Sequence, residues 1–136
     1  EDWILRGDWS VKAGYDLGSQ IMQLADRPTA IVAGNDQLAY GAILAAQDHG
    51  LRVPQDIAIV GYDDDEISKI SNPTISTVQM PLFKMGQVAA QNLLNQINNE
   101  TYISQEQLIK GELIVRQSCG APEGEHIRAS NFVRDS

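Results

Sequence analysis

The sequence predicts an α/β fold built on a parallel sheet, because short apolar runs alternate with amphipathic segments of helix length. Two of these runs end in the same way. Residues 57–62 lead to Asp63, and residues 30–33 lead to Asn35. Strands that alternate with helices of this length form right-handed βαβ units and a parallel sheet. Ligands bind such sheets just beyond the carboxyl ends of the strands, so both endings are candidate binding positions.

The first half of the chain divides into elements with recognisable ends. Residues 3–5 are apolar and predict a short strand. Ser10 is placed to cap a helix over residues 11–25, where apolar side chains recur at helical spacing. A second helix is expected over about residues 37–49, and Gly50 stands at the usual position of a helix stop.

The second half has a different pattern. Residues 63–72 are polar, and residues 75–80 form an extended stretch. Pro81 fits the first turn of a helix over about residues 82–98, which has one apolar face. The apolar pairs and triplets within residues 108–115 suggest one more extended segment.

Composition and charge narrow the function classes. Eighteen acidic residues against ten basic ones give a net charge of −8, which repels phosphate backbones and makes nucleic-acid binding by this segment alone unexpected. No apolar run approaches the roughly 20 residues of a membrane span, and the first residues show no signal peptide. The single cysteine, Cys119, excludes an internal disulfide and is compatible with a reducing compartment. We find no catalytic constellation and no metal or cofactor motif, so we expect no enzyme, no cofactor and no metal site.

Three residues are candidate ligand contacts. Asp63 only accepts hydrogen bonds when ionised, so it suits a ligand rich in hydroxyl or amine donors. Asn35 both donates and accepts, which matches a hydroxyl group, although its ordinary role would be to cap the following helix. Trp9 lies in a Gly-Asp-Trp-Ser turn. Its indole can stack on the apolar face of a sugar ring, or it can simply cover a sheet edge.

The remaining acidic residues near these positions have simpler interpretations. Asp64, Asp65 and Glu66 follow Asp63 directly and are expected to form a solvated acidic loop. The spacing and the central glycine of a calcium loop are missing. Asp36 stands in the first turn of its helix, where a carboxylate compensates the helix dipole.

Taken together, these motifs resemble the C-terminal part of the effector domain in the LacI/GalR family of sugar-responsive bacterial repressors. The resemblance runs from about Trp3 to Ser118. One matching segment alone is weak evidence for the family, but six segments in the same order make the resemblance specific. The matching segments are residues 7–15, 28–36, 50–57, 60–64, 73–78 and 113–118.

The resemblance implies a periplasmic-binding-protein-like fold, in which two Rossmann-like subdomains close on a ligand in the cleft between them. It implies that Trp9 stacks on the ligand and that Asn35 and Asp63 hydrogen-bond to sugar hydroxyls. Met80 and Leu82 fall where the chain crosses between subdomains, near the ligand in some relatives.

The family's dimer surface corresponds to a helix and a following loop of this chain. The residues concerned are Tyr40, Ile67, Ile70 and Ser71.

The resemblance also implies how the chain is divided. The helix-turn-helix and nearly all of the first subdomain are not in this sequence, so the helix over residues 82–98 is expected to lack its usual cover. We therefore expect that helix either to repack on a neighbour or to belong to a chain truncated from a longer one. The implied parts are residues 1–77 as a partial C-terminal effector subdomain, 78–107 as crossover and helix, 108–119 as a returning strand, and 120–136 as a flexible tail.

The function implied by the resemblance is that of the effector-binding part of a cytoplasmic transcriptional repressor. A sugar effector would shift the equilibrium between two states of a homodimer or higher homo-oligomer and so change operator binding. DNA would be contacted only through the absent N-terminal domain, and no membrane contact is expected. Trp9 and Asn35 favour a carbohydrate over a purine.

Two alternatives differ in class. A periplasmic sugar-binding protein of a transporter shares the fold but is exported, so a signal peptide upstream in place of a helix-turn-helix would identify it. An α/β enzyme or a phospho-acceptor domain that uses Asp63 is more distant. The phospho-acceptor needs paired acids at a first strand end and a lysine at a later strand end, and neither is evident here.

Overall fold

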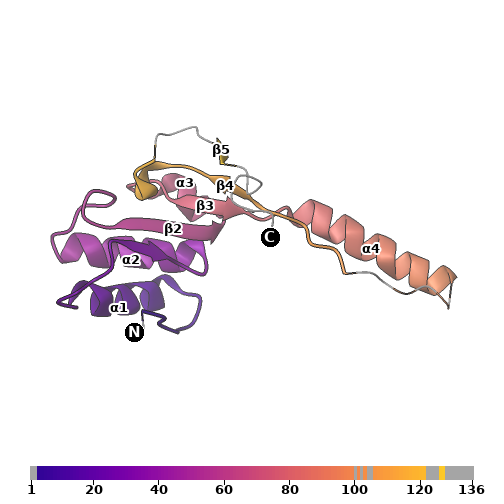
Figure 1. Ribbon diagram of the computed structural model, residues 1–136, viewed down its shortest axis with the longest axis horizontal. Coiled ribbons are helices and arrows are strands. Elements are labelled where there is room, and N and C mark those ends of the chain that lie inside the picture. Colours follow the sequence, from indigo (N-terminus) through magenta and orange to yellow (C-terminus); the bar gives the residue numbers. More distant parts are fainter. Residues whose placement is uncertain (1–2, 100, 102, 104–105, 122–125, 128–136) are drawn as a thin grey trace, which may run out of the picture.

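A five-stranded sheet forms the centre of the computed structural model, which describes residues 3–99, 101, 103, 106–121 and 126–127 (Figure 1). The strands lie in the spatial order β1-β2-β3-β4-β5. The first three are parallel, whereas β4 and β5 each run antiparallel to the preceding strand. The predicted α/β fold with a parallel sheet is therefore confirmed. The strands are Ala30–Val32, Ala58–Asp63, Ser76–Gln79, Glu112–Ile114 and His126–Ile127.

Two long helices pack beside the sheet and begin where the sequence predicts. Helix α1 spans Val11–Met22, and Ser10 caps it by accepting a hydrogen bond from the Ala13 amide at 3.1 Å. Helix α2 spans Asp36–Asp48. The chain leaves α2 through Gly50, whose φ of +74° is a left-handed conformation that favours glycine.

Helix α2 lies between the sheet and α1. It packs against β2 on one side and against α1 on the other (Figure 1). The two helices approach closely at Gly14 and Gly41, because a β-carbon at either position would lie within 2.3 Å of backbone atoms of the facing helix. Two apolar clusters lie between α2 and the sheet. Their buried members are Ala39, Ala42, Ile43, Ile59 and Ile75 in one, and Met22, Ala46 and Ile57 in the other.

Two local predictions are corrected. Residues 3–5 form no strand, because Trp3 and Leu5 instead line a hollow against α1 and β1. A short helix, α3 (Glu66–Ile70), occupies most of the segment that was expected to be the loop of the family's dimer surface. Its start is held by Ser68, whose hydroxyl donates to the Asp65 carbonyl at 2.6 Å.

The C-terminal part joins the sheet through other residues than expected. Residues 108–111 are not in a strand, so the extended segment is limited to the three residues of β4. A short 3₁₀ helix, η1 (Gln117–Cys119), follows. In the segment expected as a tail, residues 126–127 form β5, and residues 122–125 and 128–136 lie outside the described residues.

Helix α4 (Leu82–Asn98) extends away from the rest of the molecule (Figure 1). Its bounds agree with those predicted from apolar spacing. None of its residues is buried, although the structure describes every one of them. The large apolar side chains left exposed on it are Leu82, Phe83, Met85, Leu93, Leu94 and Ile97. None of the helices among the described residues is long and apolar enough to cross a membrane.

Candidate functional site

The two predicted strand endings meet at one edge of the sheet. Strands β1 and β2 are parallel, and Val32 pairs with Val60. The Ala33 amide continues the pairing by donating to the Val60 carbonyl at 2.8 Å. Asn35 and Asp63 each follow three residues after this last register pair, so both emerge at the carboxyl ends of adjacent strands. This is the edge at which open α/β sheets bind ligands.

Trp9 is brought to the same edge by contacts with the end of β1. The Asn35 side-chain amide donates to the Trp9 carbonyl at 3.1 Å. The Trp9 ring lies on Gly34, where a β-carbon would come within 2.7 Å of its Cζ3 atom. The indole is nevertheless 67% exposed, so most of its surface remains free for another molecule. Trp9 therefore covers the sheet edge and also presents an open face there.

Asn35 performs the local role that its position suggested. Its Oδ1 atom accepts a hydrogen bond from the Leu38 amide at 2.9 Å and so caps α2. Its Nδ2 group is already bonded to Trp9. A side-chain amide has two donor hydrogens and two acceptor lone pairs, so these bonds leave one of each. Asn35 orients the Trp9 turn and retains a limited capacity to bind a ligand hydroxyl.

Asp63 ends β2 in an unusual conformation. Its φ is +103°, and Asp64 after it has a φ of +59°. The Asp63 side chain is exposed at the edge. Desolvation raises its pKa above the ordinary value, and the nearby negative charge of Asp65 adds to this rise. A ligand that donates hydrogen bonds would stabilise the ionised form of Asp63.

Asp64 does not belong to a solvated loop, and that expectation is wrong. Its side chain is only 7% exposed and accepts a 2.6 Å hydrogen bond from Nη2 of Arg116. Gln79 donates to the other carboxylate oxygen at 2.9 Å. Burial opposes ionisation, but these partners keep the pKa of Asp64 below its ordinary value. Asp65 and Glu66 are exposed, as expected.

Asp36 lies in the first turn of α2, as expected, and is buried there. It is fully inaccessible, and its Oδ2 atom accepts the Asp65 amide hydrogen at 2.7 Å. Its Oδ1 atom has no hydrogen-bond partner. Burial is the main cause that raises the pKa of Asp36. Among the described residues, no group of three or more His, Cys, Asp or Glu side chains is arranged to hold a metal ion.

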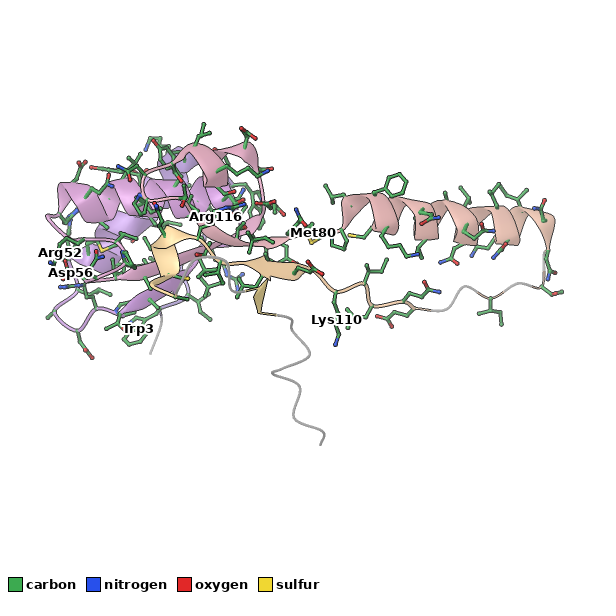
Figure 2. The ribbon with its side chains drawn as sticks, turned by 90° about the horizontal axis from the view of Figure 1, so that it is seen from above. Trp3, Arg52, Asp56, Met80, Lys110 and Arg116 are labelled. Carbon is green, nitrogen blue, oxygen red and sulfur yellow. The ribbon has the colours of Figure 1, made fainter. Side chains whose placement is uncertain are left out.

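Met80 and Leu82 lie where the chain leaves the sheet. Gln79, the last residue of β3, pairs with Asp63 in the sheet register, and Met80 follows it directly. Figure 2 shows Met80 at the junction between the sheet and α4. Leu82 is exposed at the start of α4. Both residues therefore lie just past a strand that neighbours Asp63.

Of the four residues expected at a dimer surface, Tyr40 lies on α2 and Ile67 and Ile70 lie on α3, and these two helices contact each other. Ser71 follows α3 directly. Tyr40 and Ile67 are partly buried, and Ile70 is 68% exposed. Ser71 is buried and offers almost no surface.

The sequence interpretation missed four residues around Asp63. Arg116 and Gln79 bind Asp64, Asp36 binds the Asp65 amide, and the Thr77 hydroxyl accepts the Asp64 amide hydrogen at 3.3 Å. Arg116 is separated from Asp64 by 52 residues, so local spacing gives no indication of their pairing. The one available indication was the Val-Arg-Gln-Ser motif after β4, which contains Arg116.

Comparison with known proteins agrees with this geometry. The family model described as a periplasmic binding protein-like domain matches residues 3–119. The HTH-type transcriptional repressor PurR of Photorhabdus laumondii is 38% identical over 118 residues, which are 87% of this chain and 35% of that protein. The chain thus spans about a third of the length of the curated relatives that it matches.

Solved structures show the same similarity. The lac repressor dimer bound to operator and the anti-inducer ONPF is 36% identical, with a TM-score of 0.76 over 85% of this chain and 40% of that one. A complex of the transcriptional regulator CelR with cellobiose is 29% identical, with a TM-score of 0.76 over 82% of this chain and 34% of that one. The chain belongs to the family of periplasmic-binding-protein-like domains, and it matches a fragment of the effector-binding domain of LacI/GalR regulators, as its motifs predicted.

Proposed function

We propose that this chain supplies one side of the effector site in a cytoplasmic transcriptional repressor and that its effector is a sugar. The observation that carries the proposal is the joint placement of Trp9 and Asp63 at one sheet edge, with Asn35 linking the Trp9 turn to the end of β1. The names of the similar proteins support a repressor rather than an exported transporter component.

The three residues suit a carbohydrate for complementary reasons. A pyranose ring has an apolar face of C–H groups and a rim of hydroxyl groups. The exposed face of Trp9 can cover the apolar face of the ring. The Asp63 carboxylate can accept hydrogen bonds from two hydroxyls, and such charge-assisted bonds are the stronger kind. Asn35 can then serve one further hydroxyl through its remaining donor or acceptor.

The opposing wall of the site would come from another subdomain. Helix α4 supports this arrangement, because its apolar side chains have no cover in the described part of the chain. We propose that residues 1–77 and 108–119 form one subdomain, and that the helix within residues 78–107 packs on a second one. Met80 and Leu82 would then lie at the crossover, beside the ligand. Closure of the two subdomains on the sugar would change operator binding through a DNA-reading domain outside this chain.

The proposed homodimer uses the exposed part of α2 and α3. Tyr40, Ile67 and Ile70 supply its apolar surface, and Ile70 contributes most because it is the most exposed of the three. Ser71 is buried, so its role would be to hold the end of α3. Ile70→Asp should dissociate the dimer in sedimentation analysis. A dimer of unchanged stability in this variant would exclude α3 from the interface.

A ligand screen tests the effector proposal. The full-length protein is screened by thermal shift against lactose, cellobiose, hexoses and purines, because any ligand of the native state raises the unfolding temperature. Asp63→Asn should abolish the shift given by the bound sugar, since an amide cannot supply a charged acceptor. Asp26→Asn is the matched control, because Asp26 is an exposed aspartate in the segment before the amino end of β1, whereas the proposed site lies beyond the carboxyl ends of the strands. A purine as the only ligand, or an unchanged shift in Asp63→Asn, would contradict the proposal.

A further inference from the structure

The turn that carries Asp63 has a backbone conformation that its own residues do not favour. Asp63 and Asp64 both have positive φ, at +103° and +59°. Aspartate enters the left-handed region more readily than most residues, but two in succession without a glycine are uncommon. Such conformations persist when surrounding contacts hold them, and they concentrate at functional sites. The contacts that hold this turn are therefore relevant to the direction in which Asp63 points.

Two backbone amides of the turn donate hydrogen bonds to side chains of α2 and β3. The Asp65 amide donates to the fully buried Asp36 at 2.7 Å. The Asp64 amide donates to the Thr77 hydroxyl at 3.3 Å. Asp36 itself is fixed closely against β2, because a β-carbon on Gly61 would lie 2.2 Å from its Oδ1 atom. The residue at position 61 must be glycine for this carboxylate to reach the turn.

The side chain of Asp64 accepts hydrogen bonds from Gln79 and Arg116, which belong to the segments that lead to and from α4. Gln79 is the last residue of β3, and Arg116 lies two residues beyond β4. Arg116 binds Asp64 through Nη2, while its Nη1 atom donates to the Ile75 carbonyl at 2.8 Å and to the Ser68 hydroxyl at 3.0 Å. The Arg116 side chain is 17% exposed, so its planar group is confined as well as paired.

From this arrangement we infer that Asp36, Thr77, Gln79 and Arg116 form a support network whose role is to position the Asp63 carboxylate for its ligand. Arg116 is its central member, because its guanidinium joins Asp64 to α3 and to Ile75, the residue before β3. The inference rests on the proposed ligand contact of Asp63. These four residues are positioning residues and need not touch the ligand.

The support network assigns a separate role to each acid of the Asp63-Asp64 pair. Arg116 neutralises Asp64, so Asp64 serves as an internal tie and not as a second ligand acceptor. Asp63 is left as the acid exposed at the sheet edge. A pair of adjacent carboxylates is thereby divided into one that fixes the turn and one that faces the ligand.

Amide hydrogen exchange of the full-length protein tests the network without a ligand. In Arg116→Met, peptides covering residues 61–66 should exchange at least tenfold faster, because the turn loses the stronger of the two contacts that hold Asp64. Arg52→Met is the matched control. Arg52 also forms a forked pair with an aspartate, Asp56, but that pair lies at the end of the sheet opposite α4 (Figure 2). Exchange at residues 61–66 should be unchanged in this control.

Sugar affinity tests whether the network positions Asp63 or only stabilises the fold. Lactose and cellobiose are titrated calorimetrically into wild-type protein, Arg116→Met, Arg116→Lys and the double variant Asp64→Asn/Arg116→Met. We expect at least tenfold weaker binding in Arg116→Met and a smaller loss in Arg116→Lys, which keeps the charge but not the planar fork. In Arg116→Met the buried Asp64 loses its closer cation and keeps only Lys69 at 3.8 Å. The double variant removes this poorly compensated charge, so it should regain thermal stability without regaining affinity. A merely structural role would restore both together.

The outcomes separate the inference from the proposed function. If Asp63→Asn binds sugar as wild type does, or if wild type binds none of the sugars in the screen, the proposed function fails and the exchange result alone decides on the network. Unchanged exchange at residues 61–66 in folded Arg116→Met would overturn the inference. Wild-type affinity in the double variant would also overturn it. Should Arg116→Met not fold, the same exchange and affinity measurements on the double variant and on Arg116→Lys decide the question.

Discussion

Replacement of Gly34 by alanine tests whether the Trp9 face is used by the ligand. A β-carbon at this position would stand 2.7 Å from Cζ3 of Trp9, whereas ordinary contacts begin at 3.4 Å. The ring must therefore retreat by about 0.7 Å or swing to another rotamer. Because the indole is largely exposed, solvent gives it room to do so, and the free energy of unfolding should change by less than about 1 kcal/mol.

The effect on binding should be larger than the effect on stability. Stacking on one aromatic face contributes about 1 kcal/mol, so a displaced indole should weaken sugar binding roughly fivefold. Calorimetric titration of the full-length protein measures this loss, and urea unfolding measures the stability. Trp9→Ala sets the upper limit, because it removes the ring altogether. If folded Gly34→Ala protein binds the sugar as tightly as wild type while Trp9→Ala binds it more weakly, the contact between Gly34 and the Trp9 ring is wrong. If neither variant loses affinity, the stacking role of Trp9 is refuted.

Three further predictions concern stability. Gly41→Ala should destabilise the fold by about 3 kcal/mol or more, because the added carbon would stand 2.2 Å from the Val11 carbonyl oxygen where α1 and α2 meet. A urea midpoint equal to that of wild type would contradict this prediction. The pKa of Asp36 is raised in the fold, so its burial opposes folding at neutral pH and this penalty is relieved as pH falls through the raised pKa toward 3.8. Asp36→Asn, which keeps an acceptor for the Asp65 amide, should therefore gain stability over wild type at pH 7 and lose that advantage near pH 4; an advantage independent of pH would exclude the charge as its cause. Leu93 is 57% exposed on α4, so Leu93→Ala should change the free energy of unfolding of the 136-residue chain by less than about 0.5 kcal/mol. In a full-length protein in which a second subdomain covers α4, the same substitution should lower the free energy of unfolding by about 2–5 kcal/mol. Equal effects in the two proteins would mean that α4 has no such cover.

The long elements of this fold were predictable because their reasons are local. The periodic apolar positions of α1, α2 and α4 and the caps at Ser10 and Asn35 lie within a few residues of the structure that they specify. Short elements carry less of this information. Helix α3 has five residues and β5 has two, so neither contains a full apolar period. The apolar residues 3–5 predicted a strand, but apolar character alone does not distinguish strand pairing from packing of side chains against α1 and β1.

The position of the candidate site could be predicted from the sequence, but the contacts that hold its residues in place could not. The ends of β1 and β2 placed Asn35 and Asp63 at one edge, since parallel strands share the direction of their carboxyl ends. The ion pair between Asp64 and Arg116 depends on the fold as a whole, which brings the turn after β2 beside the end of β4. Nothing in the local sequence around Asp64 distinguishes it from the exposed acids that follow it.

A crystal structure of the full-length protein with the sugar found in the screen tests the central claim most directly. We predict that two sugar hydroxyls lie within hydrogen-bond distance of the Asp63 carboxylate and that the apolar face of the ring lies against Trp9. We also predict that Arg116 remains on Asp64 in the complex. A sugar bound at another place, with Asp63 and Trp9 both free of it, would contradict the account.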